Sequence, residues 1–431
     1  MVIKEGDNML LQFSVENYRS FKERAVLSLE ASADKELENN FTVVGKERIL
    51  NSAAVFGANA AGKSNLIRAL TAAIMTVRQS NNRQINDPLE WIIPFGFDQK
   101  CLVRPTSFEF VFLAKGKKYV YGFSATKTAV NTEYLYVYHT AKASTVFERT
   151  SCNRYKFTSS AVKRELFPMI ERNTDNKLFL ATATSWNCES TRIPYLWFAE
   201  MINTYSNDSQ QLVQLVSPMF DNGDETLRAF TNRLLHEADI NISDYTYKSV
   251  EVTGEEAKQF LPKEIQSIVS VLPFAGKEIR IEAIHTVEEN GTVRQYRLPL
   301  GEESQGTQHL FLFSPVLKRA FDNGETLCVD EFDASLHPLM VIYLMKLFNN
   351  PEINRAHAQL IASAHAMELL SLDRLRRDQI YFVEKKRKTG ESELYSLDEF
   401  SPRKNEDVRK AYLRGRYGSV PDISEEADLW Q

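Results

Sequence analysis

Residues 57–64 read Gly-Ala-Asn-Ala-Ala-Gly-Lys-Ser, a spacing that can bind phosphate. In such a loop the backbone N–H groups and the start of the next helix wrap the phosphates, because both carry partial positive charge. Lys63 would reach the β- and γ-phosphates, and the hydroxyl of Ser64 would bind Mg²⁺. A chance glycine-rich turn is the alternative, but an apolar strand pattern over 51–56 enters the loop and a helical pattern over 65–79 leaves it. We therefore predict a nucleoside triphosphate site.

An acidic pair follows a second strand pattern. The short stretch Thr326 to Val329 ends at Asp330 and Glu331. Beside a phosphate loop, Asp330 would bind Mg²⁺ directly or through water, and Glu331 would polarise the attacking water. Taken singly, such a pair is more often a strand that ends at a solvated turn. Its position after the phosphate loop and before Asp333-Ala-Ser-Leu-His-Pro favours the catalytic interpretation.

A third segment, residues 300–307, reads Leu-Gly-Glu-Glu-Ser-Gln-Gly-Thr and precedes a helical pattern. Small residues and a hydroxyl at a helix N-terminus form an anion-binding surface that suits a γ-phosphate, and Ser304 and Gly306 are the candidates. An ordinary helix cap is the alternative, but a cap needs only one hydroxyl. The place of this segment shortly before the acidic pair favours the phosphate interpretation.

A histidine follows a third strand pattern. Residues 359–365 read Gln-Leu-Ile-Ala-Ser-Ala-His, so His365 comes directly after an apolar strand. An imidazole there can hydrogen-bond a terminal phosphate and report whether it is present. A lone histidine is usually structural or merely exposed. The order of the four segments along the chain is what favours a functional role for His365.

Strand and helix patterns place these segments on an α/β core. Antiparallel strands are expected over 106–139, and strands alternate with helices after residue 278. This pattern predicts an α/β fold whose core is assembled from both ends of the chain around an inserted, mostly helical subdomain. The expected domains are 9–150 for the N-terminal part of the core, 151–275 for the insertion and 276–431 for the C-terminal part.

The composition argues against several functional classes. The chain has 431 residues, of which 43% are hydrophobic, so it can bury a large core in two or three units. A net charge of -5 argues against a uniformly basic surface that binds nucleic acid by charge alone. The four cysteines form no Cys-x-x-Cys pair, which argues against a zinc ribbon or a disulfide framework. No stretch reaches ~20 consecutive apolar residues and no apolar leader pattern is present, so we expect a cytoplasmic protein with no membrane partner.

Together the motifs resemble those of the ABC-like ATPase heads shared by RecF, Rad50, SMC and OLD proteins. The chain is most similar to the bacterial AAA-15/AAA-21 type ATPases of defence loci, the RloA and AbiL-like group, except over about 150–275. The implied fold is a P-loop NTPase head of the ABC type with an antiparallel β subdomain. The residues that carry the resemblance are Asn17-Tyr-Arg-Ser-Phe21, the loop 57–64, Ser304-Gln-Gly306-Thr307, Asp330-Glu331, Leu336-His337-Pro338 and His365.

The resemblance implies ATP and Mg²⁺ as cofactors, with Asp330 and Ser64 at the metal. Glu331 would be the hydrolytic base, and Lys63 and His365 would complete the catalytic set. The signature serine and glycine would contact ATP bound to the opposite subunit, which implies a homodimer or a higher homo-oligomer. The residues implied at the nucleotide are Gly57, Asn59, Ala60, Ala61, Gly62, Lys63, Ser64, Asn65, Ser304, Gly306 and Arg19.

The chain departs from the family pattern in three respects. Its signature reads Glu-Ser-Gln-Gly-Thr where transporters have Leu-Ser-Gly-Gly-Gln, so Gln305 fills one glycine position and we expect a weaker contact with the opposite subunit. No long coiled-coil arm interrupts the head, and Gln99 is only a candidate for the Q-loop glutamine. A carboxylate set of the Toprim type is also missing from the C-terminal part, which argues against an OLD-type nuclease in the same chain.

The leading hypothesis is an ATP-driven sensor or regulator in a bacterial anti-phage system, of the abortive-infection or restriction-like kind, whose output passes through a separate effector protein such as a nuclease. The alternative is a RecF-like ATPase head of DNA repair that binds DNA. Local charge for DNA comes from Lys385-Lys-Arg-Lys388, although the same run fits a solvated hairpin turn. A third hypothesis places a catalytic site in the insertion, with His139, His236 and Glu237 as candidates that lack metal-site spacing.

Overall fold

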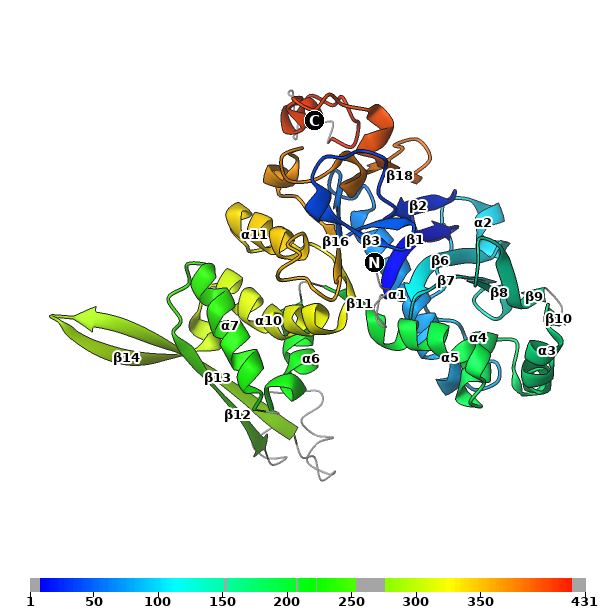
Figure 1. Cartoon of the computed structure of the whole chain (residues 1–431), viewed down its shortest axis with the longest axis horizontal. Helices are drawn as coiled ribbons and strands as arrows, with labels where there is room; N and C mark the ends of the chain where they lie inside the picture. The colour runs from blue at the N-terminus through cyan, green and yellow to red at the C-terminus, as the bar shows by residue number, and fades with distance from the viewer. Residues whose placement is uncertain (1–7, 151–152, 207, 222, 253–275, 421–431) are drawn as a thin grey trace, which may run out of the picture. The chain divides into compact units, whose positions relative to one another are not determined.

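The computed structural model describes residues 8–150, 153–206, 208–221, 223–252 and 276–420 (Figure 1). The chain divides into two compact units. Unit 1 comprises Met1–Ser206 and Ala320–Gln431, and unit 2 comprises Asn207–Arg319. The division falls within the helix α10 (Gln305–Asn323).

Unit 1 contains a six-stranded sheet whose first five strands are parallel. The last strand returns antiparallel to its neighbour. Strands with both faces covered read as continuous apolar runs, and every residue of the three central strands β15, β16 and β5 is buried. The order across the sheet is β11 (Ile202–Tyr205), β15 (Thr326–Val329), β16 (Gln359–Ser363), β5 (Ser52–Phe56), β17 (Ile380–Lys385) and β18 (Ser392–Ser396).

A second sheet of unit 1 has seven antiparallel strands, which confirms the expected antiparallel subdomain. The pairing of the N-terminal strand with residues 106–114 brings distant parts of the sequence side by side (Figure 1). The order is β10 (Arg154–Lys156), β9 (Ala143–Thr150), β8 (Val130–Tyr138), β7 (Lys117–Ala125), β6 (Thr106–Ala114), β1 (Met9–Glu16) and β2 (Ala25–Ser28). A separate two-stranded sheet joins β3 (Phe41–Val44) and β4 (Glu47–Leu50).

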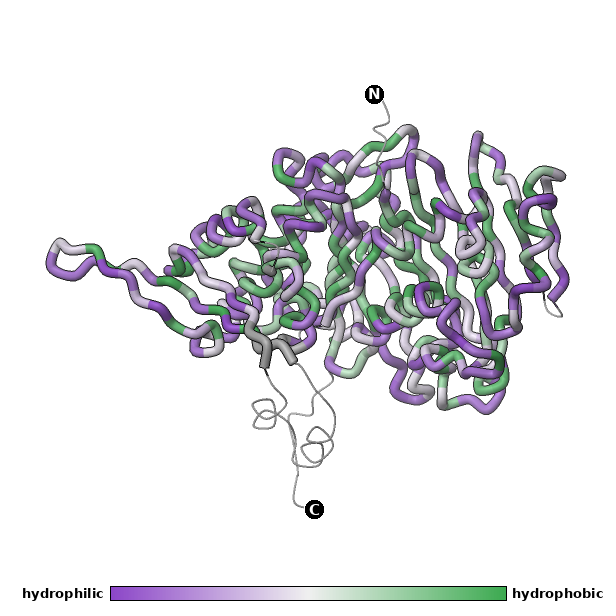
Figure 2. The backbone as a smooth tube through the Cα atoms, turned by 90° about the horizontal axis from the view of Figure 1, so that it is seen from below, coloured by the Kyte–Doolittle hydropathy of each residue, from purple (hydrophilic) through white to green (hydrophobic). Residues whose placement is uncertain are grey.

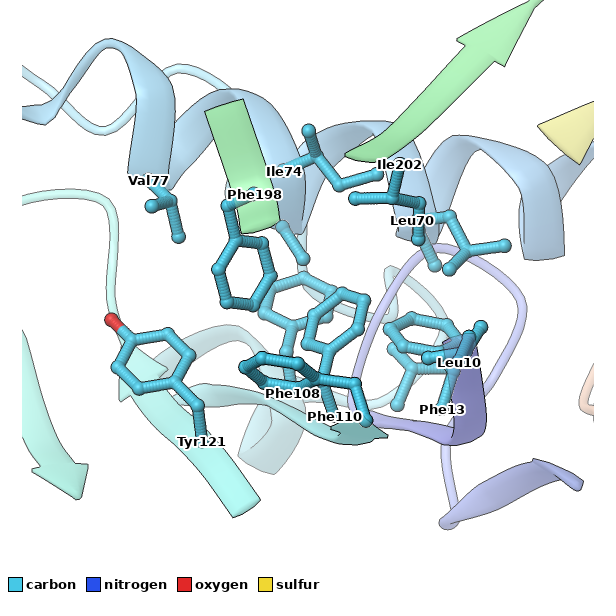
Figure 3. Packing of buried hydrophobic residues seen from close by; sticks show 14 of the residues in the cluster. Leu10, Phe13, Leu70, Ile74, Val77, Phe108, Phe110, Tyr121, Phe198 and Ile202 are labelled. Carbon is cyan, nitrogen blue, oxygen red and sulfur yellow. The ribbon is translucent and has the colours of Figure 1, made fainter. Parts of the chain in front are cut away.

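The helix α1 (Lys63–Arg78) packs in the core that both sheets share. Its buried apolar residues recur at helical spacing, and Figure 3 shows Leu70 and Ile74 above the rings of Phe108 and Phe110 from β6. The same cluster includes Cys328 of β15 together with other buried residues of the parallel sheet. The helix that follows the loop of residues 57–64 is therefore held by a buried core that includes residues of both sheets.

The remaining helices of unit 1 lie on these sheets or in their connections. The longer ones are α2 (Gln99–Val103), α3 (Ser160–Leu166), α4 (Phe179–Ser185), α5 (Glu189–Leu196), α11 (Pro338–Phe348) and α12 (Val408–Leu413). Short helical turns cover Glu38–Asn40, Ser80–Asn82, Phe167–Arg172, Trp197–Met201, Met367–Leu369, Arg377–Gln379 and Leu397–Phe400.

The expected insertion over 151–275 stays a prediction, whereas the compact units divide after residue 206 and again after residue 319. Residues 153–206 are mostly helical, as expected, but they belong to unit 1 because they pack on the antiparallel sheet. The buried carboxylate of Glu133 in β8 accepts hydrogen bonds from the N–H groups of Phe179 and Leu180 at the start of α4. The ring of Trp197 stacks on Phe112 of β6 at 4.1 Å.

The described residues of unit 2 form two helices, a three-stranded antiparallel sheet and the first part of α10. The elements are α6 (Ser209–Asp221), α7 (Glu225–Glu237), β12 (Asp244–Val252), β13 (Gly276–Glu289), β14 (Thr292–Pro299) and the turn η6 (Leu300–Glu302). Its core includes the stacked rings of Phe220 and Phe311, with Tyr245 edge-on to both. Strand β14 is exposed along nearly its whole length, and the β13–β14 hairpin is mostly hydrophilic toward its tip (Figure 2).

Within the described ranges, every helix is too short or too polar to cross a lipid bilayer.

Candidate nucleotide-binding site

The loop of residues 57–64 connects the buried strand β5 to α1. β5 lies between β16 and β17, and β15 follows on the far side of β16. Because these strands are parallel, their carboxyl ends meet at one edge of the sheet, where α/β folds bind their ligands. The phosphate loop, the acidic pair after β15 and the histidine after β16 therefore share this edge.

Two glycines of the loop are required by their surroundings. Gly57 (φ +154°) and Gly62 (φ +124°) adopt conformations that residues with side chains rarely adopt. A Cβ at Gly57 would collide with the carbonyl oxygen of Val383 in β17, and one at Gly62 would lie 2.6 Å from the hydroxyl of Ser392 in β18. That hydroxyl also donates to the carbonyl oxygen of Ala61 at 2.5 Å. The loop is thus fastened to β17 and β18, while Asn59 and Ala60 at its tip are exposed.

Lys63 is buried beneath the loop. Its Nζ donates to two carbonyl oxygens of the loop, at 2.9 Å and 3.3 Å. Burial lowers the pKa of Lys63, and the negative charges of Asp330, Asp333 and Glu331 act against that shift. The lysine and the acidic segment therefore lie within electrostatic range of each other, at the same edge of the sheet.

Ser363, the last residue of β16, connects the two carboxylate residues. Its hydroxyl donates to Oδ1 of Asp330 at 2.6 Å and accepts the N–H of Glu331 at 2.8 Å. Glu331 adopts a left-handed conformation (φ +52°), and its side chain is exposed. We did not predict Ser363 from the sequence. The sequence feature that could have indicated this role is a hydroxyl at the end of an otherwise apolar strand.

Asp333 connects the acidic segment to the loop that carries His365. Its Oδ2 accepts the N–H groups of His365 at 2.6 Å and of Ala366 at 2.5 Å. The imidazole of His365 is exposed. The sequence indicates no role for Asp333, since nothing in its own neighbourhood points to a partner 32 residues away.

The N-terminal turn touches the phosphate loop through Ser20 rather than through Arg19. The Ser20 hydroxyl accepts a hydrogen bond from Asn65 Nδ2 at 2.8 Å, and its carbonyl oxygen accepts the N–H of Ser392 at 2.7 Å. Arg19 is half-buried, and its Nε donates to the hydroxyl of Tyr18 at 3.3 Å. Arg19 is thus the neighbour in sequence of Ser20, which contacts the start of α1 and the β18 strand beside the phosphate loop. Ser64 is half-buried at the start of α1.

Ser304 and Gly306 lie in unit 2, where α10 begins. The hydroxyl of Ser304 accepts the N–H of Thr307 at 3.2 Å, and the two hydroxyls are 2.8 Å apart. Ser304 is therefore the helix cap that the sequence left open as an alternative. A hydroxyl keeps further hydrogen-bonding capacity after one such bond, and the residue is exposed, so capping and an anion contact are compatible.

The residues present fit a nucleotide that brings its own metal ion. No group of three or more His, Cys, Asp or Glu side chains in the described part of the chain is arranged to hold a metal by itself. Mg²⁺ usually takes one or two carboxylates and completes its shell with phosphate oxygens and water. Ser64 and Asp330 would supply the protein oxygens. The close-packed glycines and the buried ammonium of Lys63 fit the phosphate chain.

Other candidates from the sequence belong to other elements or are already paired. His139 follows β8, whereas His236 and Glu237 end α7 in unit 2, and all three are exposed. Three basic residues between 403 and 416 also have acidic partners: Arg416 pairs with Glu406 at 2.5 Å, Lys404 with Glu36 and Arg409 with Glu368. The run 385–388 begins at the last residue of β17 and continues into the turn before β18. Gln99 is the first residue of α2.

Comparison with known proteins identifies one family. The family model described as "AAA domain, putative AbiEii toxin, Type IV TA system" matches residues 52–371. No curated protein matches the chain.

Three solved structures show similarity at 12% sequence identity. The SMC head domain from Thermotoga maritima has a TM-score of 0.39 and is matched over 90% of this chain and 98% of its own. The Smc head from Pyrococcus furiosus, with an extended coiled coil and bound to the C-terminal domain of ScpA, has a TM-score of 0.41 over 91% and 98%. The recombination mediator protein RecF, in a structure titled RecF-ATPrS, has a TM-score of 0.39 over 91% and 100%.

Proposed function

The chain belongs to this family of AAA domains, and on that premise we propose that it is a Mg²⁺-dependent ATP hydrolase of the ABC type. The observation that carries the proposal is that the phosphate loop and the pair of Asp330 and Glu331 follow parallel strands of one sheet and so lie at the same edge. A phosphate loop and an acidic pair at one sheet edge are the two halves of a phosphoryl-transfer site. Ser363 holds both acidic residues at that edge.

Each side chain has a distinct role in this proposal. The loop N–H groups bind the phosphates, and Lys63 neutralises the charge that develops on them. Ser64 and Asp330 would hold Mg²⁺, which would supply further neutralisation of the phosphate charge. Glu331, exposed at the edge, orients the attacking water and accepts its proton. His365 hydrogen-bonds the terminal phosphate.

Two variants test the hydrolase proposal. Lys63→Ala removes the buried ammonium, so ATP binding should be lost in a fluorescent-nucleotide titration. Glu331→Gln keeps the size of the side chain but removes the base, so ATP should still bind while turnover falls at least a hundredfold. Hydrolysis by Glu331→Gln at the wild-type rate would refute the assignment of the base.

We further propose that ATP is sandwiched between two copies of the chain, with Ser304 and Gly306 of one copy at the γ-phosphate of the other. Support comes from the exposed hydroxyl at the start of α10, where helix N–H groups add partial positive charge. In this scheme ATP stabilises the dimer and hydrolysis releases it. Glu331→Gln should therefore accumulate as an ATP-dependent dimer in light scattering after size exclusion.

As its biological role we propose a sensor or regulator in a bacterial defence system, of the abortive-infection or restriction-like kind, that acts on a separate effector protein. The family description, which names a toxin of a toxin–antitoxin system, supports this role. Co-expression with the product of the neighbouring gene, followed by affinity purification with and without ATP, tests it. A partner retained only by the ATP-bound Glu331→Gln protein is the expected result. Failure of every neighbouring product to bind would contradict the proposal.

A DNA-binding ATPase head is the second candidate, and the basic run 385–388 favours it. All four side chains are exposed, with Lys385 at the end of β17 and the other three in the turn before β18, where Lys386 pairs with Glu393. Contacts to phosphate would make binding fall steeply with salt. A mobility-shift titration of duplex DNA over a salt series separates the two candidates, because a regulator that acts only on protein would shift no DNA even at low salt.

A further inference from the structure

Two cavities of unit 1 extend away from the phosphate loop. The first, of about 820 Å³, has residues 58–61 of the loop on one side and the β17–β18 hairpin on the other. The second, of about 680 Å³, is lined by Lys22, Phe97 and Lys388, among others. Arg387 and Gly390 line both, so the two cavities adjoin each other.

Phe97 lines the second cavity, and its ring lies over Gly390, which lines both. Its side chain is 75% exposed, which is unusual for a phenylalanine that stands beside a cavity. One side of the ring lies over Gly390, where a Cβ would come within 2.6 Å of Phe97 Cδ2. The buried ring of Phe95 meets it edge-on at 5.6 Å and 89°. The ring therefore contacts Phe95 and Gly390 and leaves the rest of its surface exposed.

Ion pairs fix the segment that carries this ring to the hairpin. Lys22 pairs with Asp98 at 3.2 Å and with Glu391 at 3.0 Å. Asp98 also accepts the N–H of Lys100 and so caps α2. Two contacts therefore set the position of Phe97 relative to the hairpin. One is the ion pair of the next residue, Asp98, with Lys22, and the other is the approach of the ring to Gly390.

The ring is close to the phosphate loop. Gly62 packs against Ser392, where a Cβ would lie 2.6 Å from the serine hydroxyl. Ser392 is two residues from Gly390, on which Phe97 lies, and two residues of extended chain span at most ~7 Å. A nucleotide whose phosphates occupy the loop can thus extend its ribose along the cavities toward Phe97.

We propose that the base of the bound nucleotide stacks on Phe97, with the ribose in the adjoining cavities. The inference rests on the proposed nucleotide site and adds the residue that receives the base. Aromatic rings accept the face of any base, so the platform gives affinity for the nucleoside part with little choice between purines. The β17–β18 hairpin forms the outer wall of this subsite.

Affinity measurements with and without a base test the proposal. Phe97→Ala should weaken ATP binding about tenfold, which corresponds to about 1.4 kcal/mol, the scale of one base–aromatic stack. Inorganic triphosphate, which has no base, should bind Phe97→Ala and the wild type equally. Val103→Ala is the matched control, since Val103 ends α2, is 79% exposed and lines neither cavity. It should bind both ligands like the wild type.

A second variant provides a direct readout. In Phe97→Trp, stacking should quench the added tryptophan emission when ATP binds, whereas triphosphate should not quench it. Equal ATP affinity of the wild type and Phe97→Ala would overturn the inference. So would a loss confined to single-stranded oligonucleotide, which would make the groove a nucleic-acid site. If the wild type bound neither ATP nor triphosphate, the proposed nucleotide site itself would fail, a result distinct from either of these.

Discussion

The hydroxyl of Ser363 donates a hydrogen bond to the carboxylate of Asp330 at 2.6 Å. The same oxygen accepts the N–H of Glu331, so one side chain sets the position of both acidic residues. Hydrogen bonds to charged groups contribute about 1.5–3 kcal/mol, which is enough to determine where a catalytic carboxylate lies.

Ser363→Ala should therefore lower the ATP hydrolysis rate about tenfold or more, since each 1.36 kcal/mol is a factor of about ten in rate. ATP affinity should change little, because the phosphate loop is untouched. Steady-state hydrolysis and nucleotide titration measure the two quantities. An unchanged kcat would show that the hydrogen bond does not position the acidic pair for catalysis.

Asp333 is predicted to act through His365. Its carboxylate accepts the N–H groups of His365 and Ala366, so Asp333→Ala should free the loop that carries the imidazole. We expect Asp333→Ala and His365→Ala each to lower kcat about tenfold. The double variant should lose little more than either single variant, because residues that act as one unit are not additive.

That double-mutant cycle needs a readout of folding as well as of rate. The melting temperatures of the three variants should stay close to that of the wild type. Independent, multiplicative losses of kcat would indicate that Asp333 has a role of its own.

The phosphate loop and the acidic pair could be predicted from the sequence because their chemistry is local. The glycines, lysine and serine of residues 57–64 are adjacent, and strand and helix patterns around them are strong. Ser363 and Asp333 could not be predicted in the same way, since each acts on a residue more than thirty positions away that only the parallel pairing of β15 with β16 brings near.

The division of the chain was harder to predict for a similar reason. The helices after residue 153 looked like part of an insertion, and only the sheet shows why they stay in unit 1. Glu133 lies in β8 as one polar residue in an alternating strand, yet it binds the start of α4. At Ser304 the hydroxyl predicted a functional helix start, but it could not distinguish a helix cap from an anion-binding site, because both use a serine at this position.

Glu133 is predicted to be important for stability. It is fully buried, lies 3.8 Å from the guanidinium of Arg149 and accepts the hydroxyl of Tyr121 at 2.9 Å. Glu133→Ala would leave Arg149 buried without its partner, so unfolding should become easier by about 3 kcal/mol or more. Denaturant unfolding of unit 1 measures the change. Arg192→Ala, in an exposed pair, is the control and should change stability by less than about 0.5 kcal/mol; a similar small effect at Glu133 would contradict the prediction.

Unit 2 should lose one source of stability in acid. The hydrogen-bonded guanidinium of Arg228 lowers the pKa of Asp244 to about 2, from an ordinary 3.8. A carboxylate with a depressed pKa stabilises the fold above its unfolded pKa, and that contribution disappears as the pH falls toward 2. Because the pair is partly exposed, its contribution is below about 1 kcal/mol.

Comparison of the wild type with Asp244→Asn isolates this effect. The wild type should be the more stable protein near neutral pH, and the difference should close as the pH falls from about 4 to about 2. Thermal unfolding followed over a pH series provides the measurement. A difference that stays constant over this range would assign the effect to packing instead of charge.

Subunit mixing tests most directly whether the ATP site is composite. Lys63→Ala and Ser304→Ala should each be nearly inactive alone, because the first variant binds no ATP and the second lacks the opposing serine at every site. In a mixed dimer, one site would combine Lys63 of the Ser304→Ala protein with Ser304 of the Lys63→Ala protein. Hydrolysis should therefore reappear when the two inactive proteins are mixed. If mixed dimers form and hydrolysis stays at the level of the separate variants, or if Ser304→Ala alone is fully active, the two-subunit site is contradicted.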